Sequence, residues 1–349
     1  MKRRVYLDHN ATMPLRPEAR AAMVAAMELV GNPSSVHGEG RAAKALIETA
    51  RAQVAEAIGA LAADIVFVSG ATEAAALACA GRGLVGADVE HDAVRAWITP
   101  DLTVAPSGAV TVPDPSGTAL QSANSETGIL QELPAELAVS DWTQSFGKRP
   151  MAFDWSGVEM ALISAHKLGG PKGIGALILR RGLDVAAQIK GGGQEMGRRS
   201  GTENIIGIAG FGAAAQAATQ DIENGVWAQV EELRKILEKT LEERAGMTTF
   251  VGQASPRLPN TSCIITPGWK GETQVMQMDL AGFAISSGSA CSSGKVKPSA
   301  VLRAMGFTED DAMSAIRVSL GPTTTEGEVR AFIEAWTKAH DRFRTRAEA

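Results

Sequence analysis

A buried strand that passes straight into a helix narrows the possible folds of this chain more than any other stretch. The run "DIVFVSG" (64–70) is rich in β-branched and aromatic residues and ends in glycine, which is typical of a buried strand. The stretch "ATEAAALACAG" follows without a break and has the composition of a helix. Two more strands are expected at 173–181 and 315–321. Strands that alternate with helices predict an α/β protein with a largely parallel sheet.

Helical patterns fill much of the remaining sequence. Apolar residues recur at three- and four-residue spacing in 16–27 and 40–60, where alanine is abundant. A longer helical pattern covers 205–246. The 349 residues, 45% of them hydrophobic, are enough for a large core and for two domains. We expect the domain boundary at the long helix, because the composition shows no linker.

Composition and charge argue against several classes of protein. No apolar run of about eighteen residues occurs, and no long apolar stretch follows the basic start, so neither a membrane span nor a secretory signal is expected. Three cysteines build no disulfide framework, which indicates the reducing cytoplasm. The 34 basic and 39 acidic residues are interspersed and give a net charge of −5, so nucleic acid is not an expected partner.

The cysteines and histidines form no metal-binding pattern. Cys79, Cys263 and Cys291 lack CxxC spacing, and the five histidines do not cluster. We expect Cys79 and Cys263 in the core. Cys291 differs, because "SSGSACSSG" (286–294) surrounds it with serines and glycines and gives it no apolar neighbours. It is either an incidental cysteine in a Ser/Gly loop or a thiol with a chemical task.

Four further stretches could carry chemistry, and each has a plainer interpretation. Lys167, in "ISAHKLGGPKGIGALIL", could form a Schiff base if partly desolvated, but from these residues alone a surface lysine before a turn is commoner. Asp141 could hold the protonated ring nitrogen of a pyridine cofactor, or cap a turn. The turn "SGATEAAA" (69–76) could cradle a phosphate, as could many small-residue turns. The loop "GGGQEMGRRSGT" (191–202) suits an anion or a mobile surface, and a lone histidine such as His91 is more often structural.

Taken together, the motifs resemble the NifS/IscS-type cysteine desulfurases, which are pyridoxal-phosphate enzymes of the class-V aminotransferase family and fold type I. Nine stretches follow the family's order over nearly the whole chain. They are "YLDHNAT" (6–12), "NPSSVHGEGR" (32–41), "SGATE" (69–73), "DWTQSFGK" (141–148), "SAHKLGGPKGIGAL" (164–177), "RSGTEN" (199–204), "RLPNTS" (257–262), "SSGSACSSG" (286–294) and "IRVSLG" (316–321).

The resemblance implies a two-domain α/β fold. A large cofactor-binding domain at 13–227 would hold a mainly parallel seven-stranded sheet flanked by helices. A smaller α+β domain, made of 1–12 and 228–349, would carry the Cys291 loop.

The same resemblance implies a set of site residues. Lys167 would carry pyridoxal phosphate, Asp141 would pair with its ring nitrogen, and Gln144 would bond its ring oxygen. His91 would stack on the ring and move protons. The expected phosphate ligands are Gly70, Ala71, Thr72, Ser164 and His166, with Thr202 reaching the phosphate of a partner subunit. The expected substrate contacts are Arg317, whose guanidinium fork suits a carboxylate, Asn10, Asn124 and Ser125.

The implied reaction converts L-cysteine to L-alanine and leaves a persulfide on Cys291. A sulfur acceptor or iron–sulfur scaffold protein would take the persulfide for iron–sulfur cluster or thio-cofactor synthesis. The implied enzyme is a cytoplasmic homodimer, and the small residues around Cys291 suit a swinging arm. Two alternatives stay open: a related lyase or transaminase, for example one acting on selenocysteine, and a paralogue of low activity that serves as an interaction subunit. The loop thiol speaks against a plain transaminase.

The sequence departs from the family's pattern at a few positions. Ser125 stands where relatives have a second asparagine, and Gln194 stands where they have histidine. Segments before His91 and between Gly128 and Asp141 are shorter than usual, and so is the C-terminal tail. We therefore expect altered geometry near Ser125 and a different choice of partner protein.

Overall fold

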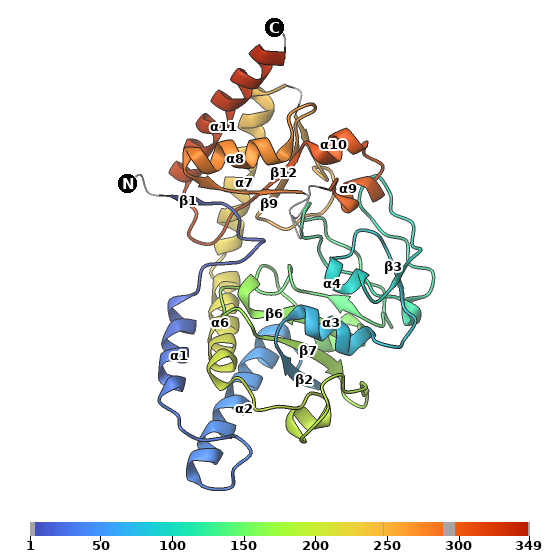
Figure 1. Ribbon diagram of the computed structural model, residues 1–349, viewed down its shortest axis with the longest axis vertical. Helices are drawn as coiled ribbons and strands as arrows, with labels where there is room; N and C mark the ends of the chain where they lie inside the picture. The colour runs from blue at the N-terminus through green and yellow to red at the C-terminus, as the bar shows by residue number, and fades with distance from the viewer. Residues whose placement is uncertain (1–3, 247, 289–296, 348–349) are drawn as a thin grey trace.

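The protein forms two lobes that meet at the middle of the molecule (Figure 1). The structure is a computed structural model that describes residues 4–246, 248–288 and 297–347. In Figure 1 the lower lobe holds α1, α2, α3 and α6, and the upper lobe holds α7, α8, α11 and both chain ends. Cys291 lies outside the described residues. Among the described residues, no helix combines the length and apolar character that a membrane crossing requires.

The lower lobe is built on a mixed sheet. Its hydrogen-bonded order is β2 (Ala63–Val68), β7 (Gly175–Arg180), β6 (Met160–Ser164) and β5 (Ser140–Asp141). Strand β7 runs antiparallel to both neighbours, whereas β5 and β6 are parallel. Parallel bridges from Ala119 to Val139 and from Val85 to Thr118 continue this arrangement toward the parallel pair β3 (Val85–Gly86) and β4 (Thr99–Pro100). The expected strands at 64–70 and 173–181 are confirmed, and β7 is an antiparallel insertion among parallel neighbours.

Alternation along the strands gives this sheet two apolar faces. Ile65 and Phe67 pack against α2 (Gly38–Ile58) and α6 (Ile205–Glu223), which α1 (Pro17–Met27) joins on the outside. Val66 and Val68 face the other way, against α3 (Ala71–Cys79). The sheet is thus covered by helices on both faces, as its unbroken apolar strands require. Two short helices, α4 (Asp92–Arg95) and α5 (Phe153–Ser156), complete this lobe.

The helical pattern at 205–246 is two helices rather than one. Helix α6 ends at Glu223, and α7 (Val226–Arg244) begins after Gly225. Gly225 has φ 70°, a left-handed conformation that interrupts the helical hydrogen bonds and that glycine adopts easily. Helix α6 packs on α1 and α2, whereas α7 packs on α11. We propose that the division between 13–227 and the second domain falls at this break.

The upper lobe contains a second, antiparallel sheet. Its order is β11 (Ser286–Ser287), β12 (Ala315–Ser319), β9 (Thr261–Ile265) and β8 (Thr249–Phe250). Its helices are α7, α8 (Gly271–Ala281), α9 (Ala300–Ala304), α10 (Glu309–Met313) and α11 (Glu326–Ala347). The first strand of the chain, β1 (Val5–Tyr6), pairs in parallel with β10 (Phe283–Ala284). The first described residues of the chain therefore belong to the lobe that is built mainly from residues after Gly225.

Candidate active site

A cavity of about 680 Å³ lies where strands of the lower lobe end. Strands β2, β5 and β6 run in the same direction, because β7 is antiparallel to both β2 and β6. Their carboxyl ends therefore meet at one edge, where ligands of α/β sheets bind. The predicted site residues that line the cavity are Gly70, Ala71, Thr72, His91, Ser125, Asp141, Gln144, Ser164, His166 and Lys167.

Lys167 lies in the 3-10 turn that follows β6 and is largely buried. Its Nζ donates to the main-chain carbonyl oxygens of Asn10 at 2.6 Å and Ala11 at 3.0 Å. Burial, aided by the positive charge of Arg317, lowers the pKa of its amine to about 8. Lys167 is therefore not a surface lysine before a turn. It is a partly desolvated amine whose unprotonated fraction near neutral pH is far larger than that of an ordinary lysine, and the unprotonated form is the one that attacks a carbonyl carbon.

Asp141 and Gln144 reach the same cavity from the end of β5 and the turn after it. One carboxylate oxygen of Asp141 accepts the backbone N–H of Thr143 at 2.8 Å, which fixes the side chain against the turn. The Gln144 amide donates through Nε2 to the carbonyl oxygen of Asn10 at 3.0 Å. The Gln144 amide and the Lys167 amine thus donate to the same carbonyl oxygen, and Asp141 lines the same cavity.

The N-terminus of α3 and the turn after β6 form an anion-binding end of the cavity. The first N–H groups of a helix have no intrahelical acceptor, and Thr72 belongs to this first turn. Ser164, His166 and Lys172 face the same end. Burial, with the charges of Lys167 and Lys172, lowers the pKa of His166 to about 4, so its ring is neutral at pH 7. Its Nδ1 lies 3.2 Å from the Thr12 hydroxyl.

Close packing at this end depends on Gly175, the first residue of β7. A Cβ there would lie 2.6 Å from the Ile163 carbonyl oxygen and 2.8 Å from the Cα of Gly70. Neither contact is possible for a real side chain, so only glycine lets β7 run against the turn that begins α3. The glycine-rich sequence after Lys167 thus shapes the candidate phosphate site.

His91 stands at the exposed rim of the cavity. It caps α4, where its Nδ1 accepts the backbone N–H of Ala93 at 3.1 Å. A neutral ring with Nδ1 as acceptor carries its proton on Nε2, the nitrogen not engaged in the cap. Nε2 is therefore the His91 nitrogen available for proton exchange, and stacking of its ring on a bound cofactor stays a prediction.

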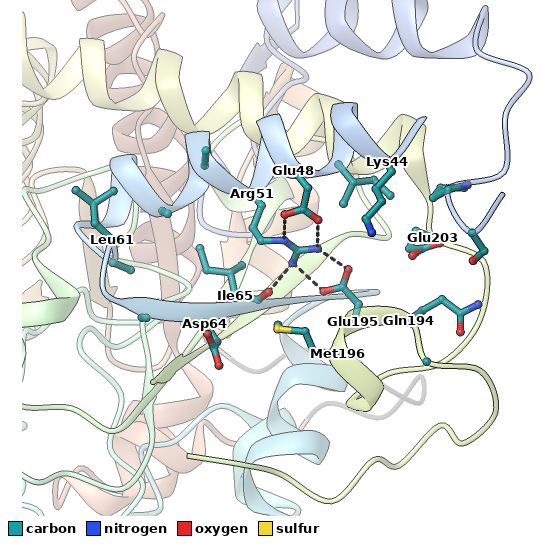
Figure 2. A pocket seen from close by; sticks show the side chains of 18 residues that line it. Lys44, Glu48, Arg51, Leu61, Asp64, Ile65, Gln194, Glu195, Met196 and Glu203 are labelled. Carbon is teal, nitrogen blue, oxygen red and sulfur yellow. Dashed lines mark hydrogen bonds and ion pairs between the residues drawn. The ribbon is translucent and has the colours of Figure 1, made fainter. Parts of the chain in front are cut away.

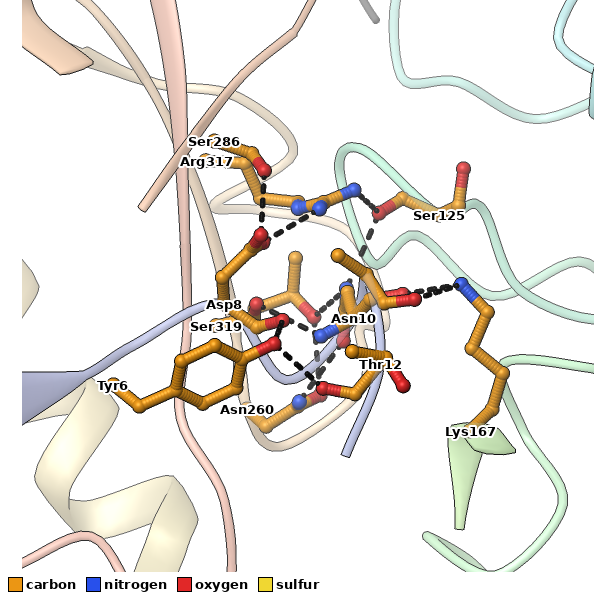
Figure 3. A network of polar contacts seen from close by, with 12 residues as sticks. Tyr6, Asp8, Asn10, Thr12, Ser125, Lys167, Asn260, Ser286, Arg317 and Ser319 are labelled. Atoms are coloured by element: carbon orange, nitrogen blue, oxygen red, sulfur yellow. Dashed lines mark hydrogen bonds and ion pairs between the residues drawn. The ribbon is translucent and has the colours of Figure 1, made fainter. Parts of the chain in front are cut away.

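Arg317 of β12 enters the region from the upper lobe (Figure 3). Its Nη2 donates to Asp8 at 2.8 Å, and its Nη1 donates to the carbonyl oxygen of Ser125 at 3.0 Å. Its Nε is buried and has no hydrogen-bond partner among residues 4–246, 248–288 and 297–347. Asp8 is itself bonded by the hydroxyl of Ser286 at 2.8 Å. A buried donor without a partner is costly, so the guanidinium fits an additional anion such as a substrate carboxylate.

Asn10 and Asn124 are not brought into the cavity. Asn10 is fully buried, and its amide bonds the carbonyl oxygen of Ser125 and the hydroxyl of Thr261 (Figure 3). The Oδ1 of Asn124 accepts the backbone N–H groups of the two residues at 126 and 127, which builds a turn. The structure gives both asparagines the task of holding the backbone around Ser125. Side-chain contact of either residue with substrate stays a prediction.

Thr202 and the glycine-rich loop lie away from the cavity. Thr202 is exposed and does not line the cavity. The paired arginines expected near an anion are instead engaged with carboxylates: Arg198 with Asp64 at 2.9 Å, and Arg199 with Glu73 at 2.9 Å. These ion pairs tie the loop to the lower lobe of its own chain, and contact of Thr202 with a partner subunit stays a prediction.

A second cavity, of about 760 Å³, is lined in part by residues 193–196 of this loop (Figure 2). Arg51 of α2 holds Glu195 through two bonds of 2.9 Å and also contacts the more exposed Glu48. Glu195 accepts the backbone N–H of Phe67 at 2.8 Å. Its φ of 47° is left-handed, so the chain is strained there and the fork of Arg51 holds it in place. This cavity contains no residue of the predicted site.

The sequence motifs contained residues whose roles we did not predict. Asp8 and Thr12 lie in "YLDHNAT", Lys148 ends "DWTQSFGK", and Lys172 follows Lys167. The structure shows which residues two of them contact: Asp8 binds Arg317, and Lys148 lies buried against Gln144.

The two other cysteines are buried, as expected. Cys79 lies in α3, where burial raises its thiol pKa to about 12, and Cys263 lies in β9, where burial raises the pKa further above the ordinary value. Neither is a nucleophile at neutral pH.

Comparison with known proteins identifies relatives over nearly the whole chain. The family model described as aminotransferase class-V matches residues 5–97 and 106–332. A cysteine desulfurase of Cereibacter sphaeroides is 40% identical over 378 residues, covering 98% of this chain and 97% of the relative. An IscS-like cysteine desulfurase of Mycobacterium tuberculosis is 34% identical and covers 99% of this chain and 98% of the relative.

Solved structures agree with the sequence comparison. The X-ray structure of a NifS-like protein from Rickettsia africae has a TM-score of 0.89 and 34% identity, and the match covers 97% of this chain and 99% of that one. A structure described as SspA in complex with cysteine has a TM-score of 0.77 and 28% identity, covering 92% and 100% of the two chains. The overall fold of the chain is therefore shared with these proteins.

Proposed function

The chain belongs to the class-V aminotransferase family, among the cysteine desulfurases, and we propose that it converts L-cysteine to L-alanine with pyridoxal phosphate and transfers the sulfur as a persulfide of Cys291. The observation that carries the proposal is the desolvated amine of Lys167, which shares one cavity with Asp141 and with an anion-binding helix end. These three groups match the aldehyde, the ring nitrogen and the phosphate of the cofactor.

Each end of the cofactor has ligands of suitable chemistry. When bound, pyridoxal phosphate is an electron sink that weakens the Cβ–S bond of a cysteine attached to it. Asp141 keeps the ring nitrogen protonated by placing a carboxylate beside it. The first turn of α3, Ser164 and His166 bind the phosphate, with Lys172 adding positive charge. Thr202 completes the phosphate site of a second subunit, so the active form is a homodimer.

Lys167 acts twice, as the attachment point and as the base. The amine of Lys167 would hold the cofactor, and when not so engaged it would take the proton from the substrate Cα. The carbonyl oxygens of Asn10 and Ala11 hold this amine at the wall of the cavity. A pKa of about 8 makes it able both to accept and to return a proton near neutral pH.

Arg317 binds the carboxylate of the substrate. Its unpartnered Nε and its fork supply the donors, and Asp8 keeps the guanidinium from turning away. Ser125 lines the cavity beside it. Its backbone carbonyl, rather than its short side chain, is bonded by Arg317. This arrangement presents the substrate Cα toward Lys167.

The sulfur leaves through Cys291. The thiolate of Cys291 attacks the substrate sulfur and forms an S–S bond while the Cβ–S bond breaks. The electron pair of the broken bond remains with the substrate carbon skeleton, and Cβ gains a proton to become the methyl group of alanine. An acceptor or iron–sulfur scaffold protein in the cytoplasm then takes the outer sulfur from the persulfide.

Two variants test this proposal directly. Purified protein reconstituted with pyridoxal phosphate should be yellow, and Lys167→Ala should abolish the visible absorption. Cys291→Ser should keep the colour but lose alanine and sulfide formation from L-cysteine with a thiol reductant. Full turnover by Cys291→Ser would contradict the proposed sulfur transfer. A protein that stays colourless with the cofactor would instead support an interaction subunit.

A further inference from the structure

A lysine without an acidic partner is buried beside the cavity. Lys148 lies at the end of the turn after β5, and its side chain is only 2% exposed. Its Nζ donates to Oε1 of Gln144 at 2.7 Å and to Oδ1 of Asn10 at 3.2 Å. Among the described residues, no carboxylate forms an ion pair with it, and the ionisable groups that act on it electrostatically are the bases Lys167 and Arg317. A buried charge with only like charges near it is unfavourable.

These surroundings favour the neutral form of the Lys148 amine. Burial lowers its pKa well below the ordinary value, and the charges of Lys167 and Arg317 lower it further. His9 lies close enough for Lys148 to affect it, and the pKa of His9 is lowered to about 4, mainly by burial, so this ring adds no charge at pH 7. Lys148 meets two acceptors, and its amine has enough N–H bonds for both in either protonation state.

Lys148 determines which way the amide of Gln144 points. Its N–H occupies Oε1, while Nε2 donates to the carbonyl oxygen of Asn10 at 3.0 Å. Turning the amide over would place its NH₂ group against the N–H of Lys148 and its oxygen against the carbonyl of Asn10. Both contacts would be repulsive, so one orientation is fixed. The Nε2 group has two N–H bonds, and the one not used on Asn10 remains for the cavity that Gln144 lines.

We propose that Lys148 is a positioning residue that holds the Gln144 amide with an N–H toward the ring oxygen of bound pyridoxal phosphate. This inference rests on the proposed function, since it needs the cofactor in the cavity of about 680 Å³. Lys148 acts only through its neighbours. It touches Gln144 and Asn10, and it does not line the cavity itself.

The expected effect can be measured in the colour of the cofactor. A hydrogen bond to the ring oxygen favours the form in which this oxygen carries negative charge, which is the form of the bound cofactor after it loses its proton. The donor therefore lowers the pH midpoint of the visible absorption change. Losing the donor should raise the midpoint by about half to one pH unit, the equivalent of one ordinary net hydrogen bond.

The experiment is a double-mutant cycle on the reconstituted enzyme without substrate. Visible spectra are recorded from pH 6 to 10 for the wild type, Lys148→Met, Gln144→Met and the double variant. Methionine has nearly the length of lysine and no N–H donor. Lys148→Gln keeps a donor and should therefore raise the midpoint less than Lys148→Met does. Lys148→Leu replaces the Met variant if that protein does not fold, as judged by circular dichroism.

We expect Lys148→Met to raise the midpoint, and to have little effect once Gln144 is methionine, because both changes remove the same contact. An unchanged midpoint in Lys148→Met would overturn the inference. An equal shift in both backgrounds would also overturn it, because Lys148 would then act by charge rather than through the amide. In either case a coloured wild type would leave the proposed function intact. A wild type that takes up no cofactor would overturn the proposed function and this inference together.

Discussion

The ion pair of Arg51 with the buried Glu195 helps to anchor the loop that carries Thr202, and replacing Glu195 by glutamine should destabilise the protein by about 3 kcal/mol. The Glu195 side chain is 3% exposed and receives two N–H bonds of 2.9 Å from Arg51 and a third of 2.8 Å from the backbone of Phe67. Glutamine keeps the shape but sets an NH₂ group against the guanidinium and leaves the buried positive charge of Arg51 poorly compensated. Breaking such a buried pair costs about 3–5 kcal/mol, and the remaining contact with Glu48 places this case at the lower end.

The matched control lies on the same arginine. Glu48 is 55% exposed and contacts Arg51 at 3.2 Å, so Glu48→Gln should cost less than about 1 kcal/mol. Urea unfolding followed by circular dichroism measures both losses, and the slopes should stay equal because the same surface is exposed on unfolding. Equal losses for the two variants, or a loss below about 1 kcal/mol for Glu195→Gln, would refute the argument that burial gives this pair its weight.

Three more predictions concern the cavity. The pKa of Lys167 is lowered to about 8, so the unprotonated, reactive fraction of its amine grows as the pH rises. The rate at which apoprotein gains visible absorption from pyridoxal phosphate should therefore rise through about pH 8 and then level off. A rate that is constant between pH 7 and 9 would contradict this prediction. Arg317→Lys loses the guanidinium fork that reaches both Asp8 and Ser125. The KM for L-cysteine, measured from the rate of alanine formation, should therefore rise about tenfold. An unchanged KM would speak against binding of the substrate carboxylate at this residue. Gly175→Ala should lower the affinity for the cofactor in equilibrium titration, because its Cβ would meet the turn before α3, whereas Gly38→Ala, with open space around it, should bind as the wild type does.

The family, the fold class and the general activity could be predicted from the sequence. The strand and helix at 64–79 were recognisable because a β-branched run and an alanine-rich run have different periods. The order of the motifs then indicated the cysteine desulfurases, and relatives at 34–40% identity over nearly the full chain confirm it. The direction of each strand relative to its neighbours was harder to predict. An unbroken apolar strand such as β7 has the same appearance whether it runs parallel or antiparallel to its neighbours, and here it is antiparallel.

The break at Gly225 was missed because apolar spacing continues through it. A helical pattern reports which face is buried but not whether the axis is continuous, and a single glycine in such a pattern is often tolerated. The left-handed φ of Gly225 ends one helix and starts another. The sequence "ENG" before Val226 was the available signal.

The candidate site was predictable in its parts but not in its connections. Lys167, Asp141 and Gln144 were expected from their motifs, and the structure gathers them in one cavity. The tasks of Asp8 and Asn10 depend on contacts between residues more than 100 positions apart, which no local pattern contains. An asparagine amide directed at a ligand and one that holds a backbone turn look the same in a sequence.

The position of residues 5–12 has a consequence for how the site is assembled. The backbone N–H of Asn10 is bonded to the hydroxyl of Ser319, and its carbonyl oxygen is one of the two that hold the amine of Lys167. Residues 5–12 thus find their place only against a strand 309 positions later in the chain. The contact that positions the amine of Lys167 therefore depends on the two lobes having met.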